Sequence, residues 1–557
     1  MAKPRSRPQL RLDAAHVADD AAGLPEGHWS RLFFEHVYCS FDEAQFACLY
    51  EAGGRYPVSP SLLACLTILQ YTHKVSDRVA VDNTVMRRDW RVALGRDSRW
   101  AGFDPSVLCN FRKRLIAHGM ERELFEAVLD KLRELGLLSQ RRRLRVDATH
   151  LVADVAVLSR ADALSEALRI VVCDLHRLKP TLEHRPDFAR LLQTYGEETW
   201  LGQSRGSAGE LTQLAVDGLA LLEICGGHPA KGKEVLAQML RENFLFPEGA
   251  PPKPLEKDQR PDDRILTPHE PDVRAGKKGD HIWTGDKVHF VETADDDQPN
   301  FIVDVMSTDP HLNDTQVLED LAQRARFTVS GAEQLLADGG YASAHNTRCA
   351  AEAGIGLICP ARGSTSGRGG MFPTSRFRID LERHIATCPA GNESTYWRPQ
   401  QREITIRFRA ATCAACPLRS QCTSGPRGRS LGISRDYEQL LLDRARAQTD
   451  EFKALYKKRA PIESTLSHLV RDCGLRRSRY RGGPKRALHA IFAATALNVR
   501  RLLHWLASDE AQHKTVSQVS SHLPQRLSAT AWRLLTAIPR PIPDAAANPT
   551  PAATGFP

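Results

Sequence analysis

The spacing of apolar positions divides the chain into a helical first part and a second part in which strands and helices alternate. Residues 28–140 carry apolar side chains at helical spacing, with helix starts at Ser59-Pro60 and Asp104-Pro105 and a further helix expected over 76–90. Short turns between these helices suit a helix-turn-helix-like module, although any small helical bundle has the same spacing. From Arg141 polar and apolar residues alternate, which indicates a strand.

The second part has the element order of an α/β domain. A strand in RRRLRVDATHLVAD is followed by helical sequence over about 160–262, a hairpin (286–293 and 300–308), a helix, a strand ending in LLADGGY, another helix and the short strand GIGLICP. This is the order of a ribonuclease H-like domain, a mixed sheet with helices on both faces. We therefore expect such a domain over 141–370 and 451–506 with a helical insertion, a separate insert over 371–450, and a disordered Pro/Ala-rich tail over 540–557.

Composition narrows the class of protein. A chain of 557 residues is expected to fold as two to four units, and 42% hydrophobic with 26% charged residues is typical of globular proteins. No run of 18 apolar residues predicts a membrane helix, and the basic N-terminus lacks the apolar run of a secretion signal. Thirteen cysteines, an odd number, fit a reducing compartment, so the cytoplasm is expected.

Positive charge is concentrated near the C-terminal third. The net charge is +9, and the window 451–500 alone holds twelve Lys/Arg against three Asp/Glu. Clustered cations indicate a polyanion partner, because each phosphate contact releases a counterion. A solvated basic face remains the alternative interpretation.

Three acidic residues stand where a shared metal site is expected. Asp147 (LRVDATH) and Asp338 (LLADGGY) lie at the ends of predicted strands, and Glu463 begins a predicted helix. Three carboxylates brought together repel one another, and Mg²⁺ or Mn²⁺ ions are their natural counterparts. Two such ions activate a water or a 3′-hydroxyl for attack at a phosphodiester. Singly, each residue also suits a turn, a strand cap or a helix start.

Four cysteines precede Glu463 at spacings that suit a metal. Cys388, Cys413, Cys416 and Cys422 form a C-x24-C-x2-C-x5-C array. Such thiolates predict a closed, tetrahedral and structural Zn²⁺ site, with the x2 pair supplied by one tight turn. Four unrelated reduced cysteines are the alternative.

The residues around Glu463 resemble a known family. Tyr456, Arg459 and Glu463 have the spacing of the Tyr-Arg-Glu-Lys signature at the third acidic residue of one group of DDE transposases of bacterial insertion sequences. The signature's Lys falls at Val470, beside Arg471. The resemblance extends over about 28–506 and includes SDRVAVDNTV, FRKR, TPHEPDVRAGKKG, the cysteine-bearing insert and GLRRSRYRGGPKRALHAIFAATALNVRRL.

This resemblance implies a transposase that cleaves DNA at insertion-sequence ends and transfers the freed 3′-hydroxyl into target DNA, using two Mg²⁺ or Mn²⁺ ions. Asp147, Asp338 and Glu463 would then be the metal ligands, and 28–140 a DNA-binding domain. The expected partner is double-stranded DNA, both inverted repeats and target, bound by a homodimer at the nucleoid. The expected DNA contacts are Tyr456, Lys458, Arg459, Arg471, Arg476, Arg477, Arg479, Arg481, Arg112 and Arg114.

Two other functions fit the same residues. One is a transposase-derived protein that binds DNA without cutting it, and the other is a two-metal nuclease or phosphatase, because a fold does not fix a function. The helical first part and the basic window favour the transposase, since neither is needed to hold a small phosphate ester. His150, three residues past Asp147, is expected to pack or hydrogen-bond near the site.

Overall fold

A computed structural model describes residues 21–50, 57–155, 158–197, 206–296, 298–361, 370–401 and 403–508. Contacts between Cα atoms divide the chain into two compact units. The first comprises the described parts of 1–70, 75–120 and 499–557, and the second comprises 71–74 and those of 121–498. The division after Met120 comes earlier in the chain than the expected boundary at residue 140.

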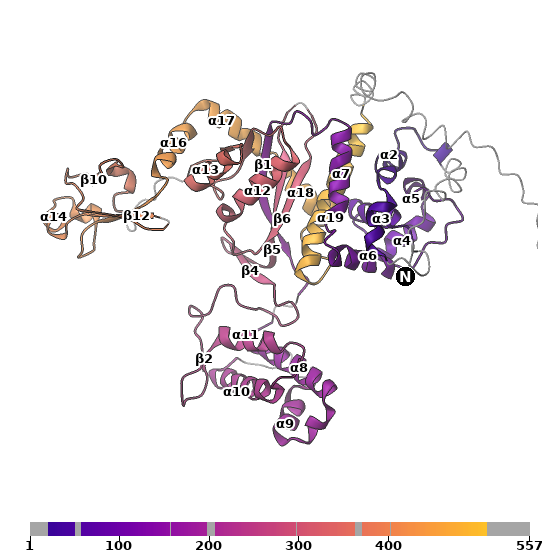
Figure 1. Cartoon of the computed structure of the whole chain (residues 1–557), viewed down its shortest axis with the longest axis horizontal. Helices are drawn as coiled ribbons and strands as arrows, with labels where there is room; N and C mark the ends of the chain where they lie inside the picture. Colours follow the sequence, from indigo (N-terminus) through magenta and orange to yellow (C-terminus); the bar gives the residue numbers. More distant parts are fainter. Residues whose placement is uncertain are drawn as a thin grey trace, which may run out of the picture. The chain divides into compact units, whose positions relative to one another are not determined.

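The first unit is helical, as the apolar spacing predicts. The helices that begin in it, labelled in Figure 1, are α2 (Trp29–His36), α3 (Pro60–Thr72), α4 (Asp77–Met86), α5 (Arg88–Ala93) and α6 (Ser106–Ala117). Ser76 caps α4, since its hydroxyl accepts a hydrogen bond from Val79 N at 3.3 Å. The single helix expected over 76–90 is wrong, because Arg87 has an extended backbone that separates α4 from α5.

The second unit is built on a six-stranded mixed sheet. Its strands are β1 (Arg143–Val152), β4 (Arg274–Lys278), β5 (His281–Thr293), β6 (Ile302–Thr308), β7 (Gln334–Leu336) and β8 (Gly356–Ile358). Their order is β4-β5-β1-β7-β8, with β6 also paired to β5. β1 is antiparallel to β5 and parallel to β7. The predicted order of elements along the chain (strand, hairpin, helix, strand, helix, strand) is confirmed and fits a ribonuclease H-like domain, and β4 is a strand that the sequence pattern did not predict.

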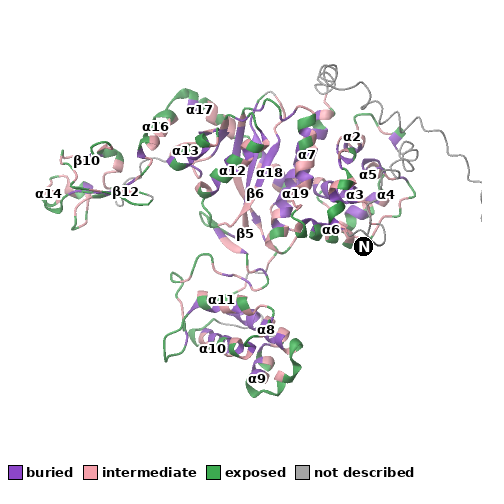
Figure 2. Cartoon of the chain, viewed as in Figure 1, coloured by how far each residue is buried: buried purple, intermediate pink, exposed green. Residues whose placement is uncertain are grey.

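Helices flank this sheet and bury it. The helices of this part are α7 (Glu123–Glu134), α12 (Asp314–Thr328), α13 (Ala344–Glu352), α17 (Asp450–Tyr456), α18 (Ile462–Asp472) and α19 (Gly483–Leu506). α12 packs along β6, α13 along β8 and α18 along β1. Asn498 of α19 exchanges two hydrogen bonds with the backbone of Ile302, at 2.7 and 2.9 Å. The second half of β5 and the first half of β6 are consequently buried, whereas β4 and the start of β5 are largely exposed or half-buried (Figure 2).

Two segments between these elements have hydrophobic cores of their own. The helices between β1 and β4, over the stretch expected to be a helical insertion, are α8 (Arg160–Leu178), α9 (Pro186–Tyr195), α10 (Ala208–Cys225) and α11 (Lys233–Asn243), followed by the short pair β2 (Phe244–Leu245) and β3 (Lys253–Pro254). Leu168, Leu214 and Met239 are part of their core. Amphipathic helices of this kind need such a core, because each has only one apolar face to bury.

The other segment lies in the expected insert over 371–450. Its elements are the strand pair β9 (Arg378–Asp380) and β10 (Ile385–Thr387), the three-stranded sheet β11 (Tyr396–Pro399), β12 (Glu403–Arg407) and β13 (Ser430–Ser434), and helices α14 (Ala410–Ala414), α15 (Arg419–Cys422) and α16 (Tyr437–Ala447). Phe377, Ile406 and Leu431 are part of its core.

Two expectations concern the chain as a whole. Within the described residues, no helix has the length and apolar character needed to cross a membrane. The tail over 540–557, expected to be disordered, lies outside the described residues.

Candidate active site

Asp147 lies on the central strand β1. The expectation that it ends this strand is wrong, because β1 continues to Val152; its parallel pairing with β7, however, stops at Arg145. The side chain of Asp147 is 15% exposed, and its Oδ1 accepts a hydrogen bond from Ala148 N at 2.8 Å. Burial raises the pKa of Asp147, and the positive charge of Arg459 opposes that rise. A cation beside Asp147 therefore stabilises its ionised form.

Asp338 lies in the turn that follows β7, as predicted from LLADGGY. Its Oδ1 accepts from Gly340 N at 2.8 Å, and its carbonyl accepts from Tyr341 N at 3.1 Å. The Cys359 thiol donates to the same carbonyl at 2.9 Å. The backbone of the turn is thus held from both sides, while the Asp338 side chain remains 38% exposed.

Glu463 occupies the first turn of α18, which begins directly after Pro461. Its side chain is 74% exposed, so it faces solvent rather than the core. The opposite side of α18 is buried through Ile462, Thr465 and Leu469. The sequence predicted this helix start.

Arg459 brings the three carboxylates to one place. Its Nη2 donates to Asp147 Oδ2 at 2.6 Å and lies 4.0 Å from Asp338 Oδ2, and its Nη1 lies 3.8 Å from Glu463 Oε1. Asp147 and Arg459 are separated by 312 positions in the sequence. The fold therefore gathers three predicted acidic residues around one guanidinium.

A second arginine of the chain shows what distinguishes this group. Arg486 also contacts three carboxylates, those of Glu270, Asp272 and Asp286. The Arg486 side chain is 1% exposed, and those of Glu270 and Asp286 are 3% and 14% exposed, so only Asp272 of this group, at 51%, reaches solvent. Because Asp338 and Glu463 are open to solvent, the group around Arg459 is accessible to an ion and a substrate.

A buried network fixes α18 to the sheet. Arg145 Nε on β1 donates to Glu292 Oε2 on β5 at 2.7 Å, and Thr465 Oγ1 on α18 donates to the other oxygen of Glu292 at 2.7 Å. Arg145 also donates to the Lys458 carbonyl at 3.2 Å. Lys458 precedes Arg459, and Thr465 is two residues after Glu463. This network therefore holds the chain on both sides of Arg459 and Glu463, within the signature segment formed by residues 456–463.

A second buried pair holds the turn of Asp338. The Tyr341 hydroxyl lies 2.7 Å from His289 Nδ1, and Thr308 Oγ1 lies 3.1 Å from His289 Nε2. Burial lowers the pKa of His289 to about 3 and raises that of Tyr341, so both stay neutral. Thr308 donates to the Lys287 carbonyl, so it accepts from His289, and Tyr341 donates to the free ring nitrogen.

Asp314 is a fourth acidic residue at this site, and the sequence analysis missed it. A Cβ placed on Gly340 lies 2.8 Å from Asp314 Oδ2 and 2.9 Å from Asp338 Oδ1. Lys287 Nζ pairs with Asp314 Oδ1 at 3.2 Å. Asp314 begins α12, where an acidic residue is ordinary, and only the order of the sheet brings it to Asp338. Two sequence features could have pointed to the other polar residues here. His289 is a polar residue inside a buried strand, and Tyr341 directly follows the two glycines.

The structure separates the arginines expected to contact DNA into distinct environments. Arg112 is wrongly assigned as a DNA contact, because it is buried in an ion pair with Asp77. Arg459 faces the carboxylates and is 12% exposed. Arg114 is exposed and stacks over Tyr50, with 4.6 Å from its guanidinium carbon to the ring centroid.

The remaining basic residues lie on or beside the signature segment. Lys458 pairs with Asp296, and Tyr456 stacks on Phe452 at 5.9 Å. Arg479 lies over the ring of Tyr71 at 4.9 Å. Among the expected DNA contacts in the window 451–500, those with exposed side chains are Arg471, Arg477 and Arg481; Lys453 and Lys457 of the same window are exposed as well.

The basic run is joined to the end of β1. Val152 N donates to the Arg476 carbonyl at 3.0 Å, and Ser478 N donates to the Val152 carbonyl at 2.8 Å. Arg476 Nη1 also lies 2.5 Å from His150 Nε2. His150 therefore hydrogen-bonds beside the site, as expected, and the strand that carries Asp147 also carries the basic run.

The four cysteines of the array line one small cavity of about 20 Å³, together with Asn392 and Arg429. Cys416 N donates to the Cys413 carbonyl at 3.4 Å, which is the tight turn predicted for the x2 pair. Arg429 N points at Cys413 Sγ from 3.5 Å. In the described residues, the three potential metal ligands whose atoms all lie within 4.8 Å of one another do not include these four sulfur atoms. The array is therefore more open than a closed zinc site.

Comparisons with known proteins found two transposase family models in this chain. A family model described as "Transposase DDE domain" matches residues 387–503, and one described as "Transposase domain (DUF772)" matches residues 21–114. The first match includes the cysteine array, Arg459, Glu463 and the basic run. No curated protein and no solved structure gave a match. Transposase models thus match both the helical first part and the basic C-terminal part of the chain, which indicates a DDE transposase.

Proposed function

We propose that the chain is an active DNA transposase of an insertion sequence, which cuts DNA at the ends of its element and joins the freed 3′-hydroxyl to target DNA. In this proposal Asp147, Asp338 and Glu463 hold two Mg²⁺ or Mn²⁺ ions. The observation that supports it is the contact of one guanidinium, that of Arg459, with all three carboxylates. Transposases of this family generally use divalent metal ions.

The donor set fits such ions. Carboxylate oxygens are the ligands that Mg²⁺ prefers, and a site open to solvent allows it to keep several waters. Asp338 and Glu463 provide that opening. Bound ions supply activation of the attacking water or 3′-hydroxyl and stabilisation of the leaving oxygen.

The chain's own residues position the carboxylates. The Arg145–Glu292–Thr465 network fixes the start of α18, and the His289–Tyr341 pair fixes the turn of Asp338. In the absence of ions Arg459 neutralises the group. When ions bind, Arg459 is no longer needed there, and its charge becomes available for a DNA phosphate, the role that the resemblance gives it.

DNA binding is assigned to the exposed cations. Arg471, Arg477 and Arg481 present charge on and near the run that is joined to β1, and Arg114 presents it on α6. Contacts of this kind bind phosphates without reading sequence, and they weaken steeply with salt. We assign a structural Zn²⁺ to the four cysteines, and a homodimer to the DNA complex on the basis of the family resemblance.

A nicking and strand-transfer assay tests the proposal. DNA carrying the repeats that flank the gene is incubated with Mg²⁺ and the wild-type protein, Asp338→Asn, or the control Asp320→Asn on the exposed side of α12. Cleavage followed by joining, lost only in Asp338→Asn, is expected. Binding without cleavage by the wild type would indicate a DNA-binding relative. Cleavage of any duplex without joining would indicate a nuclease.

A further inference from the structure

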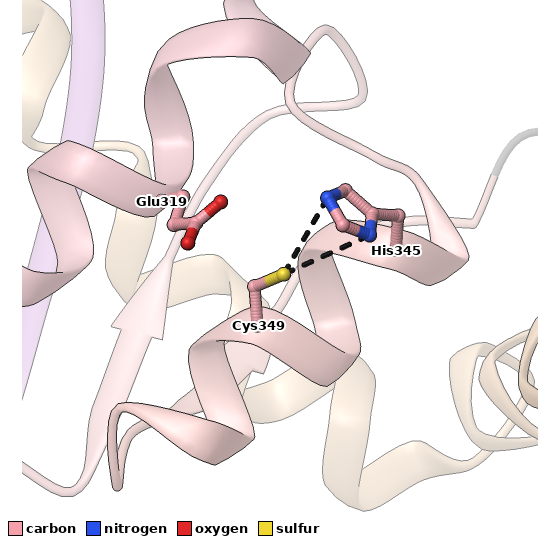
Figure 3. A group of neighbouring side chains, drawn as sticks. All are labelled: Glu319, His345 and Cys349. Atoms are coloured by element: carbon pink, nitrogen blue, oxygen red, sulfur yellow. Dashed lines mark hydrogen bonds between the residues drawn. The ribbon is translucent and has the colours of Figure 1, made fainter.

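A mixed group of side chains lies on α12 and α13, apart from the carboxylates around Arg459. Glu319 comes from α12, and His345 and Cys349 come from α13 (Figure 3). One potential ligand atom of each lies within 4.8 Å of the other two. His345 and Cys349 are four residues apart, so they share one face of their helix. Figure 3 shows the imidazole above the sulfur and the carboxylate facing both.

The atoms of this group are close enough to share a metal ion after a small rotation of the His345 ring, which lies with both nitrogens at nearly the same distance from the sulfur. Cys349 Sγ lies 3.5 Å from His345 Nε2 and 3.7 Å from its Nδ1. Tetrahedral zinc, with bonds to sulfur of about 2.3 Å and to nitrogen of about 2.0–2.1 Å, separates these two ligand atoms by about 3.5 Å. A thiol is a weak hydrogen-bond donor, so the contact with sulfur itself contributes little to holding the imidazole.

The surroundings favour a cation. The negative charges of Glu319, Glu352 and Asp436 all act on the Cys349 thiol. One competitor is present, because Arg348 Nη2 lies 3.2 Å from His345 Nδ1. Arg348 also pairs with Asp436 and, at 3.6 Å, with Glu352. These partners retain Arg348 when a metal replaces it at the imidazole.

We propose that Glu319, His345 and Cys349 bind one Zn²⁺ ion, with a water as the fourth ligand. The carboxylate of Glu319 and the neutral imidazole donate as they stand, and the Cys349 thiol releases its proton to solvent on binding. Two of the three ligands, Glu319 and His345, are exposed, so the ion enters directly from solvent. This site shares no residue with the four-cysteine array or with the carboxylates around Arg459.

The ion would join two helices that both begin beside the turn of Asp338. α12 begins at Asp314, and α13 follows the Asp338 turn. Asn346 already links them, because its Nδ2 donates to the carbonyls of Thr315 at 3.0 Å and Tyr341 at 2.8 Å. A metal one helical turn further along strengthens this link. The site thus acts as a zinc-dependent support for the turn that positions Asp338.

The difference in zinc content between variants tests the site. Full-length wild-type protein, Cys349→Ser, His345→Asn and the control Asp320→Asn, an exposed carboxylate of α12, are dialysed against equal free Zn²⁺ and analysed by mass spectrometry. Cys349→Ser and His345→Asn are expected to hold one zinc fewer per chain than the wild type and Asp320→Asn. Equal zinc in all four proteins overturns the proposal. Because only the difference is used, the result does not depend on zinc at the four cysteines or on DNA cleavage.

Cobalt gives a second readout. Co²⁺ bound to one thiolate has a sulfur-to-metal charge-transfer band, which is expected in the difference spectrum between wild type and Cys349→Ser. Zn²⁺ is also expected to raise the melting temperature of the wild type more than that of His345→Asn, whose exposed substitution leaves the fold intact. A difference spectrum without this band, or equal shifts in melting temperature, counts against the site.

Discussion

The Arg459 guanidinium donates to Asp147 Oδ2 at 2.6 Å, and this contact joins the basic signature segment to the central strand. Asp147 is buried enough for its pKa to be raised, so its charge needs a cation beside it. Arg459 supplies this cation from the protein itself. Divalent ions at the same carboxylates would therefore replace one cation by another, and the strength of metal binding depends on how readily Arg459 leaves.

Removing the charge of Arg459 is expected to strengthen metal binding and weaken catalysis. Arg459→Gln leaves three carboxylates without their cation, so the Mn²⁺ affinity of the free protein should rise by about tenfold or more. Without metal, the variant should lose about 1–3 kcal/mol of unfolding free energy, because a charged hydrogen bond to Asp147 is lost. DNA cleavage should fall, since no guanidinium is released toward the phosphates.

Electron paramagnetic resonance of free Mn²⁺ measures this affinity. Arg459→Lys keeps the charge and should resemble the wild type, and Arg177→Gln, an exposed arginine of α8, should change nothing. An Arg459→Gln protein that binds Mn²⁺ no more tightly than the wild type would show that the guanidinium and the ions do not compete.

A methyl group on Gly340 is expected to disable the site while leaving the fold stable. The added Cβ of Gly340→Ala meets Asp314 Oδ2 at 2.8 Å and Asp338 Oδ1 at 2.9 Å, so both carboxylates must move. A displacement of about 1 Å at a reacting group costs on the order of 10²-fold in rate. Gly209→Ala on α10, whose Cβ meets nothing within 4 Å, is the control. Cleavage rates measured with Mn²⁺ decide the matter, and an unchanged Gly340→Ala rate refutes the placement of these carboxylates.

The hydroxyl of Thr465 is expected to matter for both stability and activity. Thr465→Val keeps the shape but leaves the buried Glu292 oxygen without its donor at 2.7 Å. The expected cost is about 1–3 kcal/mol in urea unfolding, with slower cleavage because Glu463 lies on the same turn of α18. Thr465→Ser restores the donor and should recover both properties. If Val and Ser behave alike, the network does not position α18.

The carboxylates could be picked out from local features of the sequence. Asp147 interrupts a strand, Asp338 precedes two glycines, and Glu463 is part of a family signature. The order of strands and helices along the chain followed from periodicity and was confirmed. The sequence therefore predicted most of the fold and the acidic residues that meet.

The partners of the arginines were not predictable, because they depend on contacts far along the chain. Arg112 reads locally as part of a basic FRKR turn, yet Asp77, 35 positions earlier, neutralises it when α4 packs on α6. Asp314 reads as an ordinary helix start and reaches Asp338 only through the sheet order. Alternation and helical spacing say which face is buried, but not which charge lies opposite.

Replacing two cysteines tests the structural zinc. Cys413→Ser with Cys416→Ser removes both ligands of the tight turn, so the protein should lose one zinc per chain and become sensitive to proteolysis within 371–450, because metal binding to such a site contributes directly to folding. Cys39→Ser, an exposed cysteine of the first unit, should leave both properties unchanged. The same zinc content in the double variant and the control would leave the array as reduced cysteines.

His150 predicts a pH dependence of stability. Burial and the charge of Arg476 lower the pKa of His150 from 6.5 to about 4, because a proton on the ring would displace Arg476 from its Nε2. The folded protein then binds this proton less well than the unfolded chain, so the stability from neutral His150 is complete above pH 6.5 and is lost as the pH falls toward 4. His150→Gln keeps an acceptor for Arg476 but does not titrate. Melting temperatures between pH 7.5 and 4.5 should therefore fall further for the wild type than for His150→Gln, while a variant of the exposed His118 directly after α6, His118→Gln, should follow the wild type. Parallel curves for wild type and His150→Gln would mean that Arg476 does not restrain this imidazole, and that the basic run is held to β1 by its backbone hydrogen bonds alone.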